Sequence, residues 1–213
     1  MDTHINVVCY WWGDWAGYWG PIYVQKLYQA LKRNTSVNFT FFCFTDEPDA
    51  LRVPSIKFSP KYKWNLNKFV CFDPQYGLEG RVLTVDLDLL ILDNINDILC
   101  FKEEMITCEA AYKPNLPGGS LVGTTVDFGR ENLFNPVKKN TQEVEQKTGG
   151  SERFFFRQYL ANYDFWQRNY PGIYSYKVDC QDRVPDDARI IRFHGKPRPH
   201  ECLTSQLIEE HWR

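Results

Sequence analysis

Residues 81–93 have the sequence RVLTVDLDLLILD, in which two acids, Asp86 and Asp88, interrupt an otherwise apolar run. The five residues from Arg81 to Val85 leave no room for an exposed polar face, which is typical of a central strand in a parallel sheet covered on both sides. If the strand continues through the acids, residues i and i+2 point to the same side. The two carboxylates would then converge on one point.

These two acids predict a cation site. Burying a carboxylate is costly unless it is paired or bound to a metal. The carboxyl end of a strand is also where open α/β sheets place their ligand crevice. Oxygen ligands that leave room for phosphate oxygens suit Mg²⁺ or Mn²⁺ better than a closed zinc site. A plainer interpretation stays open, in which Asp86 caps the following turn and Asp88 is a solvated loop acid.

The segments before this run alternate between strand and helix patterns. Residues 5–10 have strand character, and the Gly- and Trp-rich residues 11–20 cannot continue that strand. Residues 21–34 begin with proline and carry the apolar stripe of an amphipathic helix. Residues 37–44 are rich in β-branched and aromatic side chains and end at a turn signal. This order predicts an α/β fold with a mainly parallel central sheet flanked by helices.

The rest of the chain is expected to continue in the same way. Strand patterns occupy 56–58, 106–110, 120–123, 173–178 and 188–193, and helical patterns occupy 63–72, 152–167 and 203–212. Residues 132–150 are polar and irregular, and we expect a mobile loop there. The length suits one domain over residues 1–213. We expect a nucleotide-binding part at about 1–95 and an acceptor and sugar part at about 96–213.

Composition excludes several classes of protein. The formal net charge of −2 over 213 residues lacks the basic excess needed to neutralise a nucleic-acid backbone, so we expect no nucleic-acid partner. None of the seven cysteines is spaced as C-x-x-C, which favours reduced thiols and a cytoplasmic location. No segment approaches the ~20 apolar residues that cross a bilayer. We therefore expect a soluble protein without a membrane span.

A second polar motif follows another apolar strand pattern near the end of the chain. Residues 190–197 have the sequence IIRFHGKP. His194 could complete a cation's ligand set through a ring nitrogen, Gly195 would let the backbone approach closely, and Lys196 would lie against a diphosphate.

Together the two motifs resemble those of the GT-A-fold glycosyltransferases. The resemblance is carried by the apolar run, Asp-x-Asp, apolar residues and Asp-Asn-Ile over residues 82–95, and by the late His-Gly-Lys-Pro. It is strongest for the retaining group that includes the glycogenin-type and lipopolysaccharide galactosyltransferases. More narrowly, nearly the whole chain is similar to N-terminal glycosyltransferase domains of multidomain chlorella-virus proteins. The resemblance implies a Rossmann-like GT-A fold, a UDP-sugar donor and room for further domains in the same polypeptide.

The resemblance also implies roles for individual residues. Mn²⁺ or Mg²⁺ would bridge the donor's two phosphates, with Asp86, Asp88 and His194 as its ligands. The residues implied in nucleotide and donor binding are Cys9, Tyr10, Trp11, Thr45, Asp46, Lys68, Asp86, Leu87, Gly119, Ser120, Gly195 and Lys196. The residues alone leave open whether Tyr10 and Trp11 are core aromatics and whether Lys68 is a solvated helix charge.

The sequence departs from the family pattern at three places. Residues 117–123 lack the asparagine of the family's Asn-x-Gly, and residues 149–153 replace its Asp-Gln. The late motif is shorter than the family's His-x-x-Gly-x-x-Lys-Pro. Glu152 is the best candidate for a catalytic carboxylate near the anomeric carbon, with Asp88 as the second catalytic candidate. An acid at the start of a helix is just as often a partner of the helix dipole.

We therefore predict a metal-dependent glycosyltransferase, specifically a hexosyltransferase. It would move glucose or a deoxyhexose such as rhamnose from a UDP-sugar to a glycan acceptor, with retention. The acceptor would be a glycan on a viral capsid glycoprotein, in the host cytoplasm.

Two other functions stay open. A non-enzymatic carbohydrate-binding module would use the tryptophans between Trp11 and Trp19 as a platform. An aspartate-based phosphotransferase is less favoured. Its acid pair belongs after the first strand and before a small hydroxyl residue, whereas here it is followed by Leu89 and Leu90.

Overall fold

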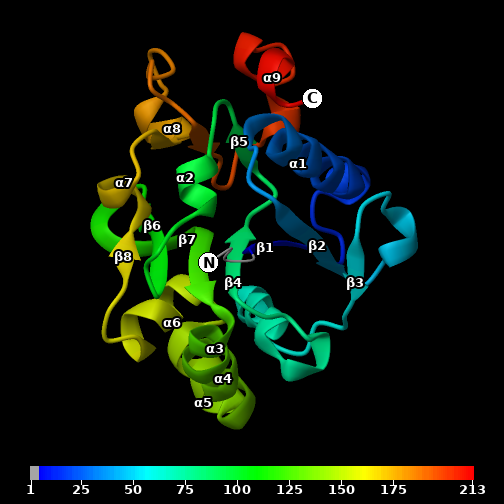
Figure 1. The fold of residues 1–213 in the computed structure, drawn as a ribbon, viewed down its shortest axis with the longest axis vertical. Coiled ribbons are helices and arrows are strands. Elements are labelled where there is room, and N and C mark those ends of the chain that lie inside the picture. The colour runs from blue at the N-terminus through cyan, green and yellow to red at the C-terminus, as the bar shows by residue number, and fades with distance from the viewer. Residues whose placement is uncertain (1–4) are drawn as a thin grey trace.

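The computed structural model describes residues 5–213, so residues 1–4 of the predicted domain lie outside the described part (Figure 1). The strands are β1 (Ile5–Trp11), β2 (Phe39–Thr45), β3 (Ser55–Lys57), β4 (Arg81–Val85), β5 (Leu89–Ile91), β6 (Met105–Ala110), β7 (Lys113–Thr125), β8 (Asp164–Phe165), β9 (Ile173–Ser175) and β10 (Ile190–Arg192). The α-helices are α1 (Gly20–Asn34), α2 (Asn96–Leu99), α3 (Val126–Gly129), α4 (Asn135–Lys139), α5 (Thr141–Thr148), α6 (Glu152–Tyr159), α7 (Trp166–Asn169), α8 (Tyr176–Asp179) and α9 (Gln206–His211). The 3₁₀ helices are η1 (Gly17–Trp19), η2 (Pro48–Ala50), η3 (Trp64–Phe72), η4 (Pro74–Tyr76) and η6 (Pro199–Glu201), and η5 (Arg130–Phe134) is a π-helix.

A seven-stranded central sheet has the strand order β3-β2-β1-β4-β7-β6-β8. The strands β3, β2, β1 and β4 are parallel to one another, and β7 is antiparallel to both of its neighbours. A smaller sheet has the order β5-β10-β9. The predicted mixed α/β architecture with a mainly parallel sheet and flanking helices is therefore confirmed.

The two faces of the central sheet bury different layers, because alternate residues of a strand point to opposite sides. In β1, Val7 and Cys9 join a core that contains α1 and the small sheet. Val8 and Tyr10 join a second core with η3 and α6. This alternation places Tyr10 on the side of the sheet from which η3 approaches.

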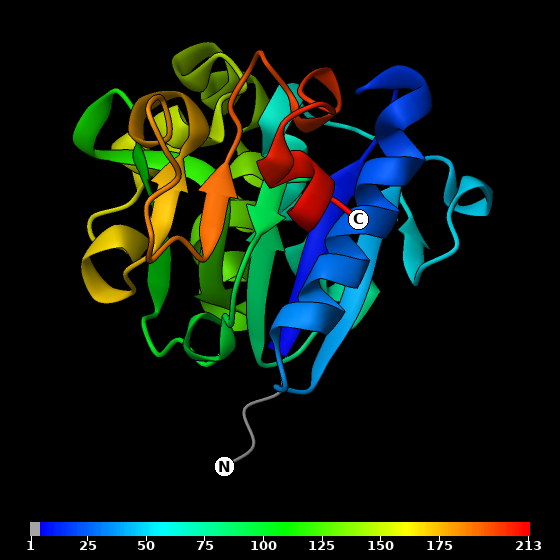
Figure 2. The same cartoon turned by 90° about the horizontal axis from the view of Figure 1, so that it is seen from above.

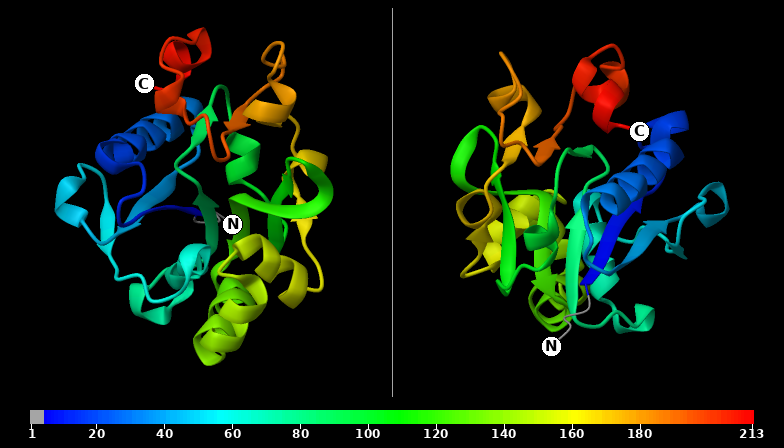
Figure 3. Two further views of the ribbon diagram at one scale, coloured as in Figure 1. Left: turned by 180° about the vertical axis from the view of Figure 1, so that it is seen from behind. Right: turned by 45° about the horizontal axis from the view of Figure 1, so that its top comes forward.

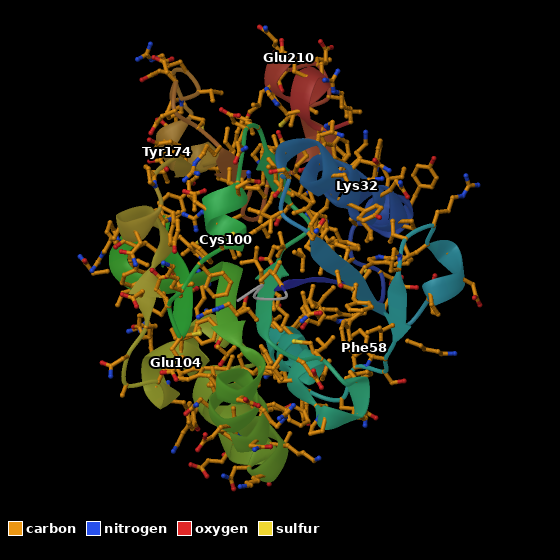
Figure 4. The ribbon with its side chains drawn as sticks, in the orientation of Figure 1. Lys32, Phe58, Cys100, Glu104, Tyr174 and Glu210 are labelled. Carbon is orange, nitrogen blue, oxygen red and sulfur yellow. The ribbon has the colours of Figure 1, made fainter. Side chains whose placement is uncertain are left out.

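The C-terminal segment lies against α1 (Figures 2 and 3). The Trp212 ring is 5.0 Å from that of Tyr23 and 5.9 Å from that of Trp19, between centroids. His200 stacks on Trp19, and its Nδ1 is hydrogen-bonded to the Tyr23 hydroxyl at 2.8 Å. In Figure 4 the Phe58 side chain lies inside the molecule, whereas Glu210 lies on the outer surface of α9.

The structure corrects the sequence-based assignment in several places. The helix expected over 152–167 ends with α6 at Tyr159 and is followed by β8 and α7, and the strand expected over 173–178 ends at Ser175, before α8. Residues 132–150 are not an irregular loop but contain α4 and α5, which bury Val137 and Val144. A strand that continues through Asp86 and Asp88 is also wrong. The strand β4 ends at Val85, and the acids lie in the turn that leads to β5. Within residues 5–213 no helix is both long and apolar enough to cross a membrane.

Candidate active site

The turn of Asp86, Leu87 and Asp88 connects the two sheets. The backbone N–H of Asp86 donates to the carbonyl of Ser120 on β7 at 2.9 Å. The carbonyl of Asp88 accepts from the N–H of Phe193, directly after β10, at 2.9 Å. Leu87 is buried between the acids, which are each partly exposed. Hydrogen bonds from both sheets therefore fix the backbone that carries the two carboxylates.

Both carboxylates border a pocket of about 450 Å³, which we call the acidic pocket. Four aromatic side chains form much of its lining: Tyr10, Trp12, Trp15 and Trp64. Its polar lining consists of Asp14, Asn65, Lys68, Asp86 and Asp88. Flat aromatic walls with a few polar groups at one end suit a planar heterocycle that carries a charged tail.

A buried lysine joins the acid turn to the opposite wall. Lys68, on η3, forms ion pairs with Asp86 and, at 2.8 Å, with Glu152 Oε1. Burial lowers the pKa of Lys68, but the charges of Asp86 and Glu152 outweigh burial and raise the pKa above its usual range. The Lys68 carbonyl accepts a hydrogen bond from the hydroxyl of Tyr10. This lysine is therefore a fixed internal cation and not a solvated helix charge.

The acids outnumber this cation. Although Asp88 is partly exposed, desolvation by the surrounding protein atoms, followed by the negative charge of Asp86, raises the pKa of Asp88 to about 7. Burial also raises the pKa of Glu152 to about 7, against the opposing effect of Lys68. Three carboxyl groups thus share one ammonium group, and additional positive charge there would favour their ionised forms.

The side chain of Glu152 packs against a glycine on β7. Glu152 begins α6, and its side chain is buried and lies against Gly119 of β7. A Cβ added at Gly119 would overlap the Glu152 carboxylate. Gly119 therefore leaves the space that lets Glu152 reach Lys68.

His194 borders a second pocket, of about 360 Å³, which we call the basic pocket. Its Nε2 is hydrogen-bonded to the hydroxyl of Ser175 at 2.7 Å. Burial, followed by the positive charge of Lys177, lowers the pKa of His194. A neutral imidazole is the form that can bind a metal. Gly119 and Ser120 also border this pocket and separate it from the acid turn.

Comparison with solved structures shows where this fold occurs. The glycosyltransferase GlyE of Streptococcus pneumoniae TIGR4 matches 99% of this chain with a TM-score of 0.68 and 12% identity. An active-site mutant of LgtC matches 96% of this chain and 92% of its own, with a TM-score of 0.65 and 11% identity. The chain has a GT-A fold. It spans 59% of the length of the GlyE chain. No protein-family model and no curated protein matches the sequence.

The side chains around the acid turn fit a divalent cation only in part. Within residues 5–213, no three histidine, cysteine, aspartate or glutamate side chains are grouped closely enough to hold an ion. Asp86 and Asp88 fit as oxygen ligands of a divalent cation. Both border one pocket, and the single ammonium group of Lys68 does not balance the negative charge there. The hydrogen bond at His194 Nε2 suits a ligand that binds through its other nitrogen, since metal-binding histidines usually engage both. The three-residue ligand set stays a prediction.

Several predicted donor residues lie away from both pockets. Cys9, Trp11 and Thr45 are buried in the sheet. Asp46 accepts a hydrogen bond from the backbone of Gly13 at 3.1 Å. Lys196 has a side chain that is 84% exposed and paired with Glu201 at 3.3 Å. Gly195, which precedes Lys196, has a φ of +70° and is also exposed.

Other pocket residues were not predicted as donor-binding. Trp12, Asp14, Trp15, Trp64 and Asn65 line the acidic pocket. The Trp-rich stretch after β1 was a signal for the first three, and the sequence held no such signal for Trp64 and Asn65. Arg192, Arg153 and Arg157 line the basic pocket. An arginine inside the apolar run of β10 was a usable signal for Arg192.

Proposed function

We propose that the chain is a glycosyltransferase that depends on a divalent metal and transfers a sugar from a UDP-sugar to a glycan acceptor. The main support is the acid pair in the turn after β4. The pair borders an aromatic pocket, and Asp86 is hydrogen-bonded to Ser120, which borders the basic pocket. The GT-A fold supports the same function. The low identity limits that support to the fold.

The protein's own residues have distinct tasks in this proposal. The aromatic side chains of the acidic pocket would hold the uracil base. Asp86 and Asp88 would hold Mn²⁺ or Mg²⁺, with His194 as the third predicted ligand. When bound, the metal supplies Lewis-acid stabilisation of the departing UDP. Lys68 keeps the Asp86 carboxylate in place through its ion pair. Lys196 would add positive charge at the phosphates when it leaves Glu201.

The catalytic carboxylate is proposed to be Glu152, with Asp88 as the second candidate. Glu152 lies behind Gly119, which borders the basic pocket. Its direct partner is Lys68, so it acts on the substrate only if that ion pair loosens. The more conservative role is to position Lys68, and through it Asp86.

The remaining details rest on the family resemblance. They are glucose or a deoxyhexose such as rhamnose as the transferred sugar, retention of configuration, and an acceptor on a viral capsid glycoprotein in the host cytoplasm. A sugar-binding module without catalysis is the second candidate, because Trp12 and Trp15 form part of a pocket wall.

The decisive test measures UDP release from a panel of UDP-sugars with Mn²⁺, with Mg²⁺ and with a chelator. We expect release that requires the metal and falls about a hundredfold or more in Asp88→Asn. The matched control is Asp93→Asn, since Asp93 is an exposed acid of the same segment outside both pockets. Absence of UDP binding and release with every donor would reject the proposal. Glycan binding without nucleotide or metal would favour the sugar-binding module.

A further inference from the structure

The basic pocket is lined by several positive side chains and by no acidic one. Its cations are Lys113 on β7, Arg153 and Arg157 on α6, and Arg192 on β10. Three elements that are distant in sequence therefore bring positive charge to one cavity of about 360 Å³. The chain as a whole has a net charge of −2, so this accumulation is local.

Arg192 is the most unusual of these cations. It is only 5% exposed, and its Nη1 donates to the backbone carbonyl of Glu109 at 3.0 Å. Its Nε has no hydrogen-bond partner, and within residues 5–213 no carboxylate forms an ion pair with it. The nearby Glu109 carboxylate is instead paired with Arg168 at 2.7 Å. A buried guanidinium without a counter-charge is costly, and a bound anion would offset that cost.

The two arginines of α6 add a second, independent observation. Arg153 and Arg157 are four residues apart, so they lie on the same face of the helix, where like charges repel. Neither forms an ion pair within the described part of the chain. Their arrangement is unfavourable for the helix alone and favourable for an anion placed between them.

Aromatic rings at the rim indicate what carries the negative charge. Phe154 and Tyr112 both border the pocket and are 46% and 68% exposed. The Arg157 guanidinium lies over the Phe154 ring at 5.5 Å from its centroid, and the Tyr112 ring meets that of His194 edge-on at 5.4 Å. Large exposed aromatic faces beside hydrogen-bonding groups are typical of sites that stack a ring while polar side chains orient it.

We propose that the basic pocket binds a sugar that carries a carboxylate or phosphate group, as the acceptor of the transfer reaction. This inference rests on the proposed function and specifies its substrate class. Gly119 and Ser120 border the pocket and contact the acid turn and Glu152, so the bound sugar lies next to the point of transfer. Arg192 pairs with the anionic group, and Arg153 and Arg157 neutralise it from the other side.

The donor diphosphate is the competing source of negative charge. None of the four cations borders the acidic pocket, where the acid pair would hold the metal that neutralises a diphosphate. The cations of the basic pocket therefore exceed what the donor's phosphates require. A charged acceptor accounts for the excess.

The test compares two glycosides that differ only in charge. Methyl β-D-glucuronide and methyl β-D-glucoside are titrated into the full chain by calorimetry, with saturating UDP and Mn²⁺. We expect the glucuronide to bind about tenfold more tightly, and its advantage to shrink as the salt concentration rises. Equal affinity for the two glycosides would overturn the inference. UDP-glucuronate is compared with UDP-glucose in the UDP-release assay, and a preference for the charged donor would assign the pocket to the donor sugar instead.

Substitutions then locate the effect. Arg157→Gln and Arg153→Gln are exposed changes, and each should weaken glucuronide binding about fivefold while leaving glucoside and UDP affinity unchanged. Arg192→Met should abolish the preference, with a thermal melt to confirm folding. Arg183→Gln is the control, because Arg183 is exposed and borders neither pocket. Equal losses of UDP and glucuronide affinity would assign the arginines to the diphosphate and overturn the inference.

The two proposals fail in different ways. UDP release without a preference for the charged glycoside would remove the acceptor class and leave the glycosyltransferase. Selective glucuronide binding without UDP release from any donor would leave the anionic sugar site and remove the transferase.

Discussion

The acidic and basic pockets are joined through the hydrogen bond between Asp86 and Ser120 but have opposite electrostatics. The acidic pocket contains Asp14, Asp86 and Asp88 with the single cation Lys68, and its lining is rich in aromatic rings. The basic pocket contains four cations and His194 with no acid. Substrates that fit the two are therefore chemically different. A molecule held through a metal suits the first, and a directly paired anion suits the second.

The connection between the pockets is maintained by an ion-paired cluster. Lys68 joins Asp86, at the edge of the acidic pocket, to Glu152, behind Gly119. Because the cluster is largely buried, its disruption should change both pockets together. Each of the following predictions tests whether the contrast between the pockets depends on this cluster.

The largest effect is expected for Lys68→Met. This change leaves Glu152 buried without its counter-charge, and we expect the free energy of unfolding to fall by about 3 kcal/mol. Urea unfolding monitored by circular dichroism measures it. Lys61→Met, an exposed lysine nearby, should change stability by less than about 0.5 kcal/mol. Similar stability in the two variants would show that the cluster does not maintain this connection.

A smaller loss is expected for Gly119→Ala. The new methyl group overlaps the Glu152 carboxylate, and relief of that overlap should cost about 2 kcal/mol. The double variant Gly119→Ala with Glu152→Ala removes the overlapping atoms. Its loss should therefore be smaller than the sum of the two single losses. Strict additivity in urea unfolding would mean that the close contact is unimportant.

The smallest effect is a pH dependence of stability. Burial raises the pKa of Glu152 from 4.5 to about 7, and that of Asp88 from 3.8 to about 7. Between the unfolded-state pKa values and the folded-state value of about 7, the folded state binds more protons than the unfolded state. The free energy of unfolding should therefore decrease as pH rises from about 4 to 7. We expect this decrease to be reduced in Glu152→Gln.

Metal should reduce the same dependence. Mn²⁺ added at pH 8 should raise the melting temperature, because it favours the ionised carboxylates, and at pH 5 it should do so much less. If the melting temperature of the unsubstituted protein equalled that of Glu152→Gln at every pH, with and without metal, the excess of carboxylates over cations at the acid turn would be contradicted.

The sequence predicted the parts of the site that depend on local pattern. The run before Asp86 predicted the strand β4 but not its end at Val85, and the acids border a pocket as predicted from their place after an apolar strand. The turn at Asp86–Asp88 was only the alternative interpretation, because the apolar residues on both sides continue the same pattern into β5. The buried pair of Lys68 and Glu152 links residues 84 positions apart, and single-sequence patterns carry no information on such contacts.

The helices of residues 132–150 were missed for a related reason. Only a few of their side chains are buried, among them Val137 and Val144, so the segment has little apolar periodicity. Tertiary packing against the neighbouring layer stabilises these short helices more than their own sequence does.

The position of the acid turn between two sheets also affects how rigid the carboxylates are. Asp86 is hydrogen-bonded to the large sheet, and Asp88 is hydrogen-bonded to the chain that leaves the small one. Sliding of one sheet against the other would change the spacing of the carboxylates. Conversely, an ion that requires a fixed spacing would resist that sliding and stiffen the junction. Binding of an ion at this turn would therefore reduce the motion of the two sheets against each other.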